Sequence, residues 1–402
     1  MSSETRKSPL DAESGTRPSV KVAVPAILLL LMAAHFLADA LATVVSPQWP
    51  NLEKSVGVNT KTMLWIFVVW HTTASFSQLL FAYLGTRFRQ RWFLWGGPAF
   101  SCVCISCIGL VSSPVALMLL LIGSGLGVAA FHPEAATSVG SSVPGHRSRV
   151  MSLFILGGFT GQAAGPYYSG LVTDTYGLPG LAATMVWGLP CVALLAFGFR
   201  KIPDATEPPS SRHQPTAPHG ARHYGRIYLV LLIQTLRNVS AMGVPIILAY
   251  LLEARGYATA QVGLVQGAFL AGIGIGGLIC AIVGRQEYEL AILRGLPFLL
   301  APVVVVIPYV DAFLIHICAG VAGTILGIAL PVMISFSQQI MPQGERIASS
   351  LTMGVSWGLG GAIVAPLLLL KESGRLDLAF PVFAITSIVS GFLAFRLPRL
   401  TG

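Results

Sequence analysis

The chain has 402 residues, of which 54% are hydrophobic and only 10% charged, and its formal net charge is +9. A soluble domain carries about 25% charged residues, so this composition excludes a soluble enzyme or binding module. The positive charge gathers in alternate loops between apolar runs and does not indicate a nucleic-acid binder.

Apolar runs follow one another along the whole chain, each near the roughly 20 residues that a helix needs to cross a bilayer. Helices satisfy their own backbone hydrogen bonds in lipid, whereas the strands of a membrane barrel would show alternating hydrophobicity. We therefore predict an all-α integral membrane protein with twelve transmembrane helices, at residues 22–45, 63–84, 92–111, 114–139, 150–173, 179–199, 226–251, 262–283, 291–310, 312–337, 347–370 and 378–396.

Basic residues predict the topology. They gather in the N-terminal tail, residues 1–21, and in alternate loops such as 87–91 and 200–226. Because Lys and Arg favour the cytoplasmic side, both termini are predicted to be cytoplasmic, in a multi-pass protein of the bacterial inner membrane. The first run ends in LADALA, which could pass for a signal-peptidase site, but its removal would leave an odd number of spans, so we expect this helix to be retained.

The segment 201–225 is rich in Pro, Ser, His and Arg and has no apolar period, which is typical of a flexible linker. It separates two six-helix bundles, residues 22–200 and 226–402, that repeat one another at an offset of about 200 residues. The matching pairs are Pro133/Pro331, Pro144/Pro342, Gly158/Gly358, Gly161/Gly361 and Pro166/Pro366.

Repeats of this kind are found in transporters that bind substrate between the halves near the bilayer midplane. We expect the helix at 150–173 to lie near the seam between the halves, because its small residues allow close packing. The residues predicted to act as conformational hinges are Pro133, Gly161, Pro166, Gly361 and Pro366.

Ionisable residues inside the predicted spans are few. A charge at the bilayer centre costs several kcal/mol, so such residues usually face the bundle interior or a watery cavity. They are His35, Asp39, His71, His132, Glu134 and Arg237, with His316 near the end of its span. His35 and Asp39 are four residues apart and share a helix face, which predicts an imidazole–carboxylate pair that takes up and releases a proton. For His71 and His316 we expect only hydrogen bonds within the bundle.

Asp39 and Arg237 differ by the offset of the repeat and therefore occupy equivalent positions in the two halves. We expect Arg237 to attract an anionic group or to reset the acid, and a permanent ion pair that holds the halves together is the alternative. His132 and Glu134 flank Pro133 and have no ionisable counterparts in the second half, so duplication does not explain them. We predict that Glu134 also exchanges protons, with a gate or a loop anchor as the alternative.

The chain contains the stretches HFLADALATVVSPQWP, FHPEAA, SLFILGGFTGQAAGP, TLRN and SFSQQIMPQGERIASSLTMGVSWGLGG, spread over nearly all of its length outside the tail and linker. Together they resemble the fosmidomycin-resistance family of the major facilitator superfamily. The resemblance implies a twelve-helix transporter driven by the proton gradient, often an exporter of drugs or small toxic solutes. It points to the residues already selected, namely His35, Asp39, His132, Glu134 and Arg237.

One loop departs from the superfamily's pattern. Between the second and third helices, members usually carry Gly-x-x-x-Asp-Arg, whereas FAYLGTRFRQRW has Ala82 and Thr86 in the Gly and Asp positions. The matching loop of the second half has Gly284 in the Asp position. We therefore expect a conformational latch that is weakened, or rebuilt around Glu287 or Glu289.

These observations favour a proton-coupled secondary transporter, an antiporter that exports a small organic solute or drug by alternating access. We expect it to work as a monomer in membrane lipid, without a cofactor or a metal. The proton-coupling residues would be Asp39, Glu134, His35 and His132, and the substrate contacts Arg237, Trp70, Tyr250 and Trp357, although packing explains the three aromatic residues equally well. Two alternatives stay open: proton-coupled uptake of an organic anion, and a non-transporting membrane sensor or scaffold. The sequence offers no metalloprotease or serine-hydrolase motif that would favour an enzyme.

Overall fold

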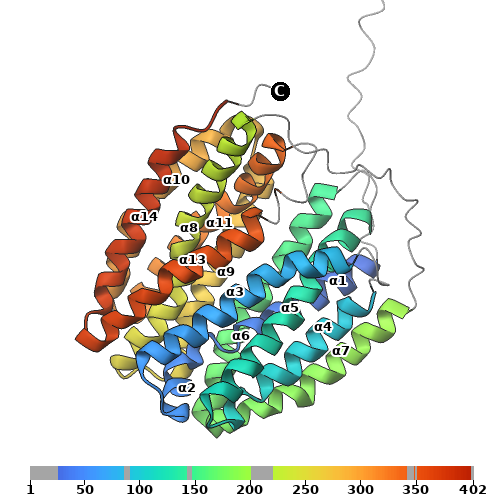
Figure 1. The fold of residues 1–402 in the computed structure, drawn as a ribbon, viewed down its shortest axis with the longest axis vertical. Coiled ribbons are helices and arrows are strands. Elements are labelled where there is room, and N and C mark those ends of the chain that lie inside the picture. Colours follow the sequence, from blue (N-terminus) through green and yellow to red (C-terminus); the bar gives the residue numbers. More distant parts are fainter. Residues whose placement is uncertain are drawn as a thin grey trace, which may run out of the picture.

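The computed structural model describes residues 26–85, 91–142, 147–200, 221–341, 348 and 351–399. This part of the chain is built of helices and contains no β-strand, which confirms the predicted all-α fold. In Figure 1 the first half (blue to green) and the second half (yellow to red) lie side by side, with α3 of the first half packed against α13 of the second.

The first half contains seven α-helices and three short 3₁₀ helices within residues 26–85, 91–142 and 147–200. They are α1 (Ala26–Thr43), η1 (Ser46–Gln48), α2 (Trp49–Val56), α3 (Thr60–Leu84), α4 (Arg91–Ser106), η2 (Ile108–Leu110), α5 (Pro114–Ser142), α6 (Arg147–Tyr176), η3 (Leu178–Ala183) and α7 (Thr184–Arg200).

The second half begins at α8, five residues before its predicted start at residue 226. Its elements are α8 (Ala221–Ala254), α9 (Thr259–Val283), η4 (Gln286–Tyr288), α10 (Glu289–Val306), η5 (Ile307–Tyr309), α11 (Ala312–Ile340), the π-helix η6 (Leu351–Val355), α13 (Ser356–Val364), η7 (Ala365–Ser373), η8 (Leu376–Leu378) and α14 (Ala379–Ala394).

Eleven helical segments of the described chain are long and apolar enough to cross a bilayer. The remaining predicted span, residues 150–173, corresponds to α6, which has 30 residues but is more polar than the others. It packs against α1 on one side and α9 on the other. Because α6 is covered by two neighbours, it needs less apolar surface than a helix that faces lipid.

Helix α6 also forms much of the seam between the halves, as the sequence predicts, because it packs closely on α9. A Cβ atom added at Gly267 of α9 would lie 2.7 Å from the carbonyl oxygen of Ala163, and one at Gly263 would collide with the carbonyl of Pro166. The two backbones can approach this closely only because these positions carry no side chain.

One end of the molecule, which we call the distal end, carries the turns at 44–59, 111–113, 177–183, 255–258, 307–311 and 374–378. The opposite end, which we call the linker end, carries the start of α1, the end of α7 and the start of α8. At the distal end Asp174 of α6 accepts hydrogen bonds from the backbone N–H groups of Thr259 (3.0 Å) and Ala260 (2.8 Å), at the start of α9. Lys371 pairs with Glu53 at 2.7 Å, and Lys54 pairs with Glu253. These contacts join the two halves.

The eleventh span changes its helix type twice, from π in η6 to α in α13 and to 3₁₀ in η7. Pro366 lies in the first turn of η7, while Pro133 and Pro166 lie inside α5 and α6. Prolines and changes of helix type are common at bends. The hinge role of these residues, and of Gly161 and Gly361, stays a prediction.

Candidate functional site

Asp39 is the centre of a buried polar cluster in the first half. It lies on α1 one turn after His35, and both residues are buried. Their closest side-chain atoms, His35 Nε2 and Asp39 Oδ2, are 3.3 Å apart. The structure thus forms the imidazole–carboxylate pair that the four-residue spacing predicts.

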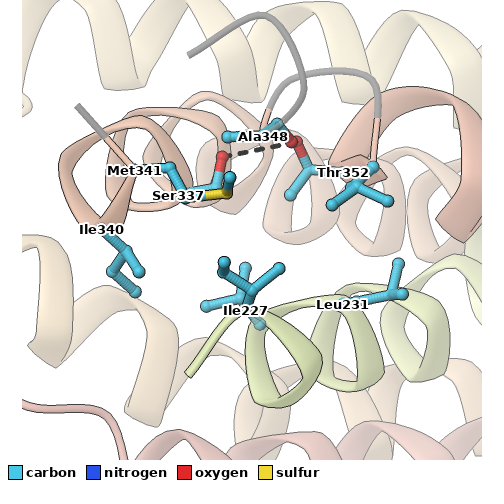
Figure 2. Close-up of a pocket in the computed structure, with 9 residues that line it drawn as sticks. Ile227, Leu231, Ser337, Ile340, Met341, Ala348 and Thr352 are labelled. Carbon is cyan, nitrogen blue, oxygen red and sulfur yellow. Dashed lines mark hydrogen bonds between the residues drawn. The ribbon is translucent and has the colours of Figure 1, made fainter. Parts of the chain in front are cut away.

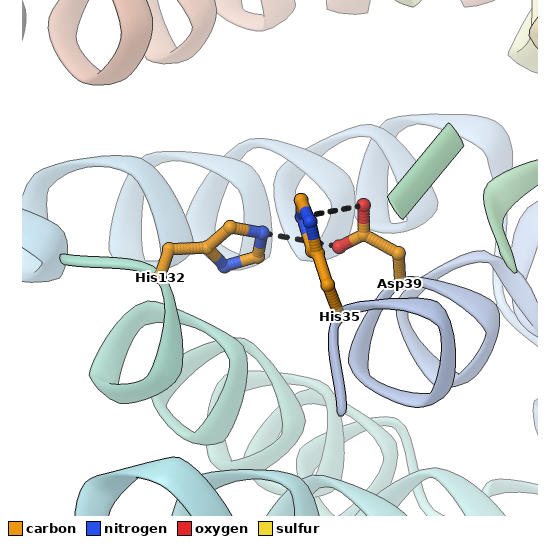
Figure 3. A group of neighbouring side chains, drawn as sticks. All are labelled: His35, Asp39 and His132. Carbon is orange, nitrogen blue, oxygen red and sulfur yellow. Dashed lines mark hydrogen bonds and ion pairs between the residues drawn. The ribbon is translucent and has the colours of Figure 1, made fainter. Parts of the chain in front are cut away.

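His132 brings a second imidazole to Asp39 from α5. Its Nε2 atom makes a hydrogen bond of 3.1 Å with Asp39 Oδ1, and its Nδ1 atom lies 2.8 Å from the backbone carbonyl oxygen of Val128. Figure 3 shows the two imidazoles approaching the two carboxylate oxygens from different helices. Half-buried His132 is the most accessible of the three side chains, at 26% exposed, against 8% for His35 and 4% for Asp39.

Helix α6 completes the cluster with groups that do not ionise. The side-chain amide of Gln162 donates a 2.8 Å hydrogen bond to Asp39 Oδ2, and the carbonyl oxygen of Phe154 lies 2.8 Å from His35 Nδ1. The Phe154 ring also stacks on the His35 ring, with centroids 4.0 Å apart. Asp39 therefore has partners on three helices.

Glycines explain how α6 reaches the cluster. A Cβ atom at Gly161 would collide with the backbone of Phe36 on α1, so the helices can touch there only without a side chain. A Cβ atom at Gly158 would lie 2.7 Å from Asp39 Oδ2 and would also overlap the His35 ring. The glycine-rich stretch that suggests close packing in the sequence is what admits α6 to the site.

The structure separates Glu134 from this cluster. Glu134 is buried on α5, and its Oε2 atom faces the end of α3, where a Cβ atom at Gly85 would lie 3.3 Å from it. Two residues along a helix turn the side chain by roughly 200°, which explains why His132 reaches Asp39 and Glu134 points elsewhere. Sequence reasoning missed Gln162 and Phe154, although both lie in the quoted stretch SLFILGGFTGQAAGP.

Arg237 is buried on α8, with 5% of its surface exposed. Its Nη1 atom has no hydrogen-bond partner within the described part of the chain, and no ion pair is described for it. The alternative of a permanent Asp39–Arg237 ion pair is therefore not realised in this conformation, in which Asp39 is bonded to His132 and Gln162 instead.

The three candidate aromatic residues lie on three different helices. Trp70 of α3 packs on Trp49, with ring centroids 5.5 Å apart, and its buried Nε1 has no partner among the described residues. Tyr250 belongs to the distal contact, because Lys371 lies 4.9 Å from the centre of its ring. Trp357 is half-buried on α13. None of these described contacts joins one of the three residues to another, and a substrate role for each stays a prediction.

The expected latch residues fall partly outside the described chain, because Thr86 lies in the segment 86–90. In the second half, Gly284 ends α9, and Glu287 pairs with Arg285 at 3.5 Å. Glu289 accepts hydrogen bonds from Ser335 (2.9 Å) and Gln339 (3.0 Å). These described contacts of Glu287 and Glu289 therefore lie within the second half and do not join it to the first half.

The ligand-type atoms of His35, Asp39 and His132 lie within 4.8 Å of one another, so a search for bound metal would begin with these three residues. The expectation of no metal stays a prediction. A separate, small crevice in the second half is partly open to the outside and includes none of the predicted site residues. As Figure 2 shows, its lining is mostly apolar and comes from both sides of the crevice, with Ile227 and Leu231 on one side and Ile340 and Met341 on the other.

Comparison with known proteins agrees with this architecture. The sequence model of the Major Facilitator Superfamily matches residues 31–366. The chain is 22% identical over 377 residues to the fosmidomycin resistance protein of Escherichia coli (strain K12), and 23% identical over 379 residues to the uncharacterized MFS-type transporter YfnC of Bacillus subtilis (strain 168). Each alignment covers 92% of this chain and 92% of the relative.

Solved structures share the fold. A bacterial homolog of the human lysosomal transporter Spinster, crystallised in an inward-facing and unoccupied conformation, superimposes with a TM-score of 0.69 at 14% identity, over 93% of this chain and 96% of that one. Its inward-facing and occupied form gives a TM-score of 0.69 at 13% identity, over 92% of this chain and 96% of that one.

Proposed function

Because this chain belongs to the Major Facilitator Superfamily, it is a multi-pass membrane transporter and not an enzyme, and we propose that it exports a small organic solute in exchange for protons. The observation that carries this proposal is the buried Asp39, which lies within the span Ala26–Val56 and is bonded to His132 and Gln162. Similarity to a fosmidomycin resistance protein supports export over uptake.

Proton coupling follows from the cost of an isolated charge in the membrane. A carboxylate in a low-dielectric interior must be neutralised, paired or hydrated. Asp39 has two imidazoles beside it, and imidazole exchanges its proton in the physiological range. A change of access from one face of the membrane to the other can therefore couple to uptake and release of protons at this cluster. Glu134 is a second proposed proton site, nearer the linker end of α5.

Arg237 is the proposed contact for an anionic group of the substrate. A buried guanidinium needs a counter-charge, and its planar array of donors suits carboxylate or phosphate-type oxygens. Arg237 lies on α8 at the position equivalent to Asp39 on α1. The same unpaired cation also favours the second candidate function, proton-coupled uptake of an organic anion.

We further propose that the linker end of the molecule is cytoplasmic, in a bacterial inner membrane, since basic residues gather in its loops. In that orientation the distal end faces outward. The hydrogen bonds and ion pairs that join the halves there then correspond to a conformation closed toward the outside.

The test is transport by the purified full chain in proteoliposomes with an imposed pH gradient. Fosmidomycin is the first probe, followed by a panel of small organic anions and cations. Movement of a probe against the proton flow supports export by antiport, and movement with the proton flow supports uptake. No stimulation by the gradient for any probe would refute proton coupling. Asp39→Asn, which keeps the shape and loses the charge, should abolish the stimulation.

A further inference from the structure

The hydrogen bond between His132 and Asp39 fixes the position of one proton. The carbonyl oxygen of Val128 can only accept a hydrogen bond, so His132 Nδ1, 2.8 Å away, carries hydrogen. In the neutral ring, Nε2 would then carry no hydrogen, and its lone pair would face Asp39 Oδ1 at 3.1 Å. Two acceptors repel at that distance, so this contact requires a proton between Nε2 and Oδ1.

His35 and Gln162 face the other carboxylate oxygen and are held in place. His35 Nε2 lies 3.3 Å from Asp39 Oδ2 as an ion-pair contact without the alignment of a hydrogen bond, so the requirement that places a proton between His132 Nε2 and Oδ1 does not extend to it. His35 Nδ1 is tied to the carbonyl of Phe154 at 2.8 Å, and its ring is stacked on the Phe154 ring. Gln162 donates to Asp39 Oδ2 at 2.8 Å and does not titrate in the physiological range. Since His35 is 8% exposed and His132 is 26% exposed, His132 is the imidazole from which a proton can reach water.

We propose that the transported proton is the one shared by His132 Nε2 and Asp39 Oδ1, while His35 and Gln162 act as positioning residues; this rests on the proposed function. Loss of that proton to the solvent leaves a neutral His132 with its lone pair against the Asp39 carboxylate. The contact between α5 and α1 then opens, and binding of a proton from the other side closes it again. The proton thus works as a removable link between two helices of the first half.

The other helices packed on this pair place no further described ionisable side chain against it. Helix α1 contributes His35, and α6 contributes the neutral amide of Gln162. On α5 itself, Glu134 faces Gly85. On α3, His71 packs on Phe67 and beside Gly361 of α13. Helix α4 meets α5 through small residues, with Gly97 and Ser101 against Gly127.

Two variants distinguish His132, which is proposed to carry the transported proton, from His35, which is proposed to be a positioning residue. His132→Gln retains an N–H donor near the position of Nε2 but cannot release it, so the link to Asp39 becomes permanent. His35→Asn retains a donor near the position of Nδ1 for the Phe154 carbonyl and also cannot titrate. We expect His132→Gln to lose stimulation by the pH gradient and His35→Asn to keep it, with fosmidomycin as the probe and a chelator in all buffers to exclude bound metal.

A second measurement needs no substrate. Histidine side chains labelled with ¹⁵N in the full-length protein in lipid nanodiscs should include one that titrates while its Nδ1 stays protonated. That resonance should be absent from His132→Gln and present in His35→Asn. Should His132→Gln not fold, His132→Asn, which keeps only the donor to Val128, replaces it.

The outcomes distinguish the two proposals. If no probe responds to the gradient in the unmodified protein, the proposed function fails, and the ¹⁵N titration still decides whether His132 holds an exchangeable proton. If the unmodified protein responds and His132→Gln responds equally, or if the titrating resonance is the one missing from His35→Asn, the assignment to His132 is overturned.

Discussion

Asp174→Ala should shift the protein away from the conformation closed at its distal end. Asp174 belongs to the first half, yet its carboxylate accepts the N–H groups of Thr259 and Ala260, which begin α9 in the second half. Helix starts leave such N–H groups without partners in their own helix. The carboxylate therefore caps a helix of the opposite half, and separation of the halves breaks both hydrogen bonds.

The size of the effect follows from capping energies. Loss of an N-cap acceptor costs typically ~1 kcal/mol, and exposure of Asp174 to solvent keeps the value near that figure instead of the upper end of the range. Because the contact exists only while the distal end is closed, this free energy belongs to the equilibrium between closed and open states. A change of ~1 kcal/mol corresponds to a roughly fivefold shift toward the open state.

The assay is a distance measurement across the distal end between spin labels at Tyr176→Cys and Tyr309→Cys, in a variant whose six native cysteines are replaced. Asp174→Ala should increase the long-distance population, and Asp174→Asn, which keeps one acceptor oxygen, should have a smaller effect. The matched control is Asp311→Ala, because Asp311 pairs with Arg255 inside the second half at 3.3 Å. An unchanged distribution in Asp174→Ala, or an equal shift in the control, would refute the reasoning.

Three further predictions concern buried residues. Asp39→Asn should fold and insert normally but lose gradient-driven transport, measured in proteoliposomes beside a thermal-unfolding curve; normal stimulation would remove Asp39 from the mechanism. Gly158→Ala forces a methyl group to within 2.7 Å of Asp39 Oδ2, so it should lower the free energy of unfolding by about 1–3 kcal/mol and reduce coupling, whereas Gly277→Ala, which meets nothing within 4 Å, should do neither. Arg237→Gln should weaken binding of an anionic substrate by about tenfold or more, the loss of one charged hydrogen bond, with Arg237→Lys in between; equal dissociation constants for all three proteins would show that Arg237 does not bind the anion.

Much of the fold could be predicted from the sequence, because crossing a bilayer imposes length and hydropathy on each helix. The prediction of helix boundaries fails where a helix end does not coincide with the end of an apolar run. The first span was expected to end at residue 45, but helical structure resumes through η1 and α2 up to Val56. Pro47 and Pro50 lie near the starts of these short helices, where a missing N–H is tolerated. If a proline is interpreted only as a helix breaker, this continuation of the helical structure is missed.

The site was predictable in part for a similar reason. Because an ionisable group in lipid costs free energy, His35, Asp39 and His132 stand out as candidate site residues. The four-residue spacing then predicts the pair of His35 and Asp39. The sequence cannot specify how far α5 and α6 are rotated about their axes, so neither the His132–Asp39 hydrogen bond nor the contribution of Gln162 could be derived. Gln162 carries no charge, and the hydropathy criterion that finds Asp39 passes over it.

The packing of α6 between α1 and α9 has a consequence for how this protein is made. As the chain leaves the ribosome, α6 enters the membrane after α1 but before α9, which follows only when α7, the linker and α8 have been synthesised. Until then the side of α6 that carries Ala163 and Pro166 lacks its partner on α9, and α6 is the most polar of the spans. Stable insertion of the first half is therefore completed by the second, and a chain truncated after α7 would leave a membrane segment for quality-control proteases to remove.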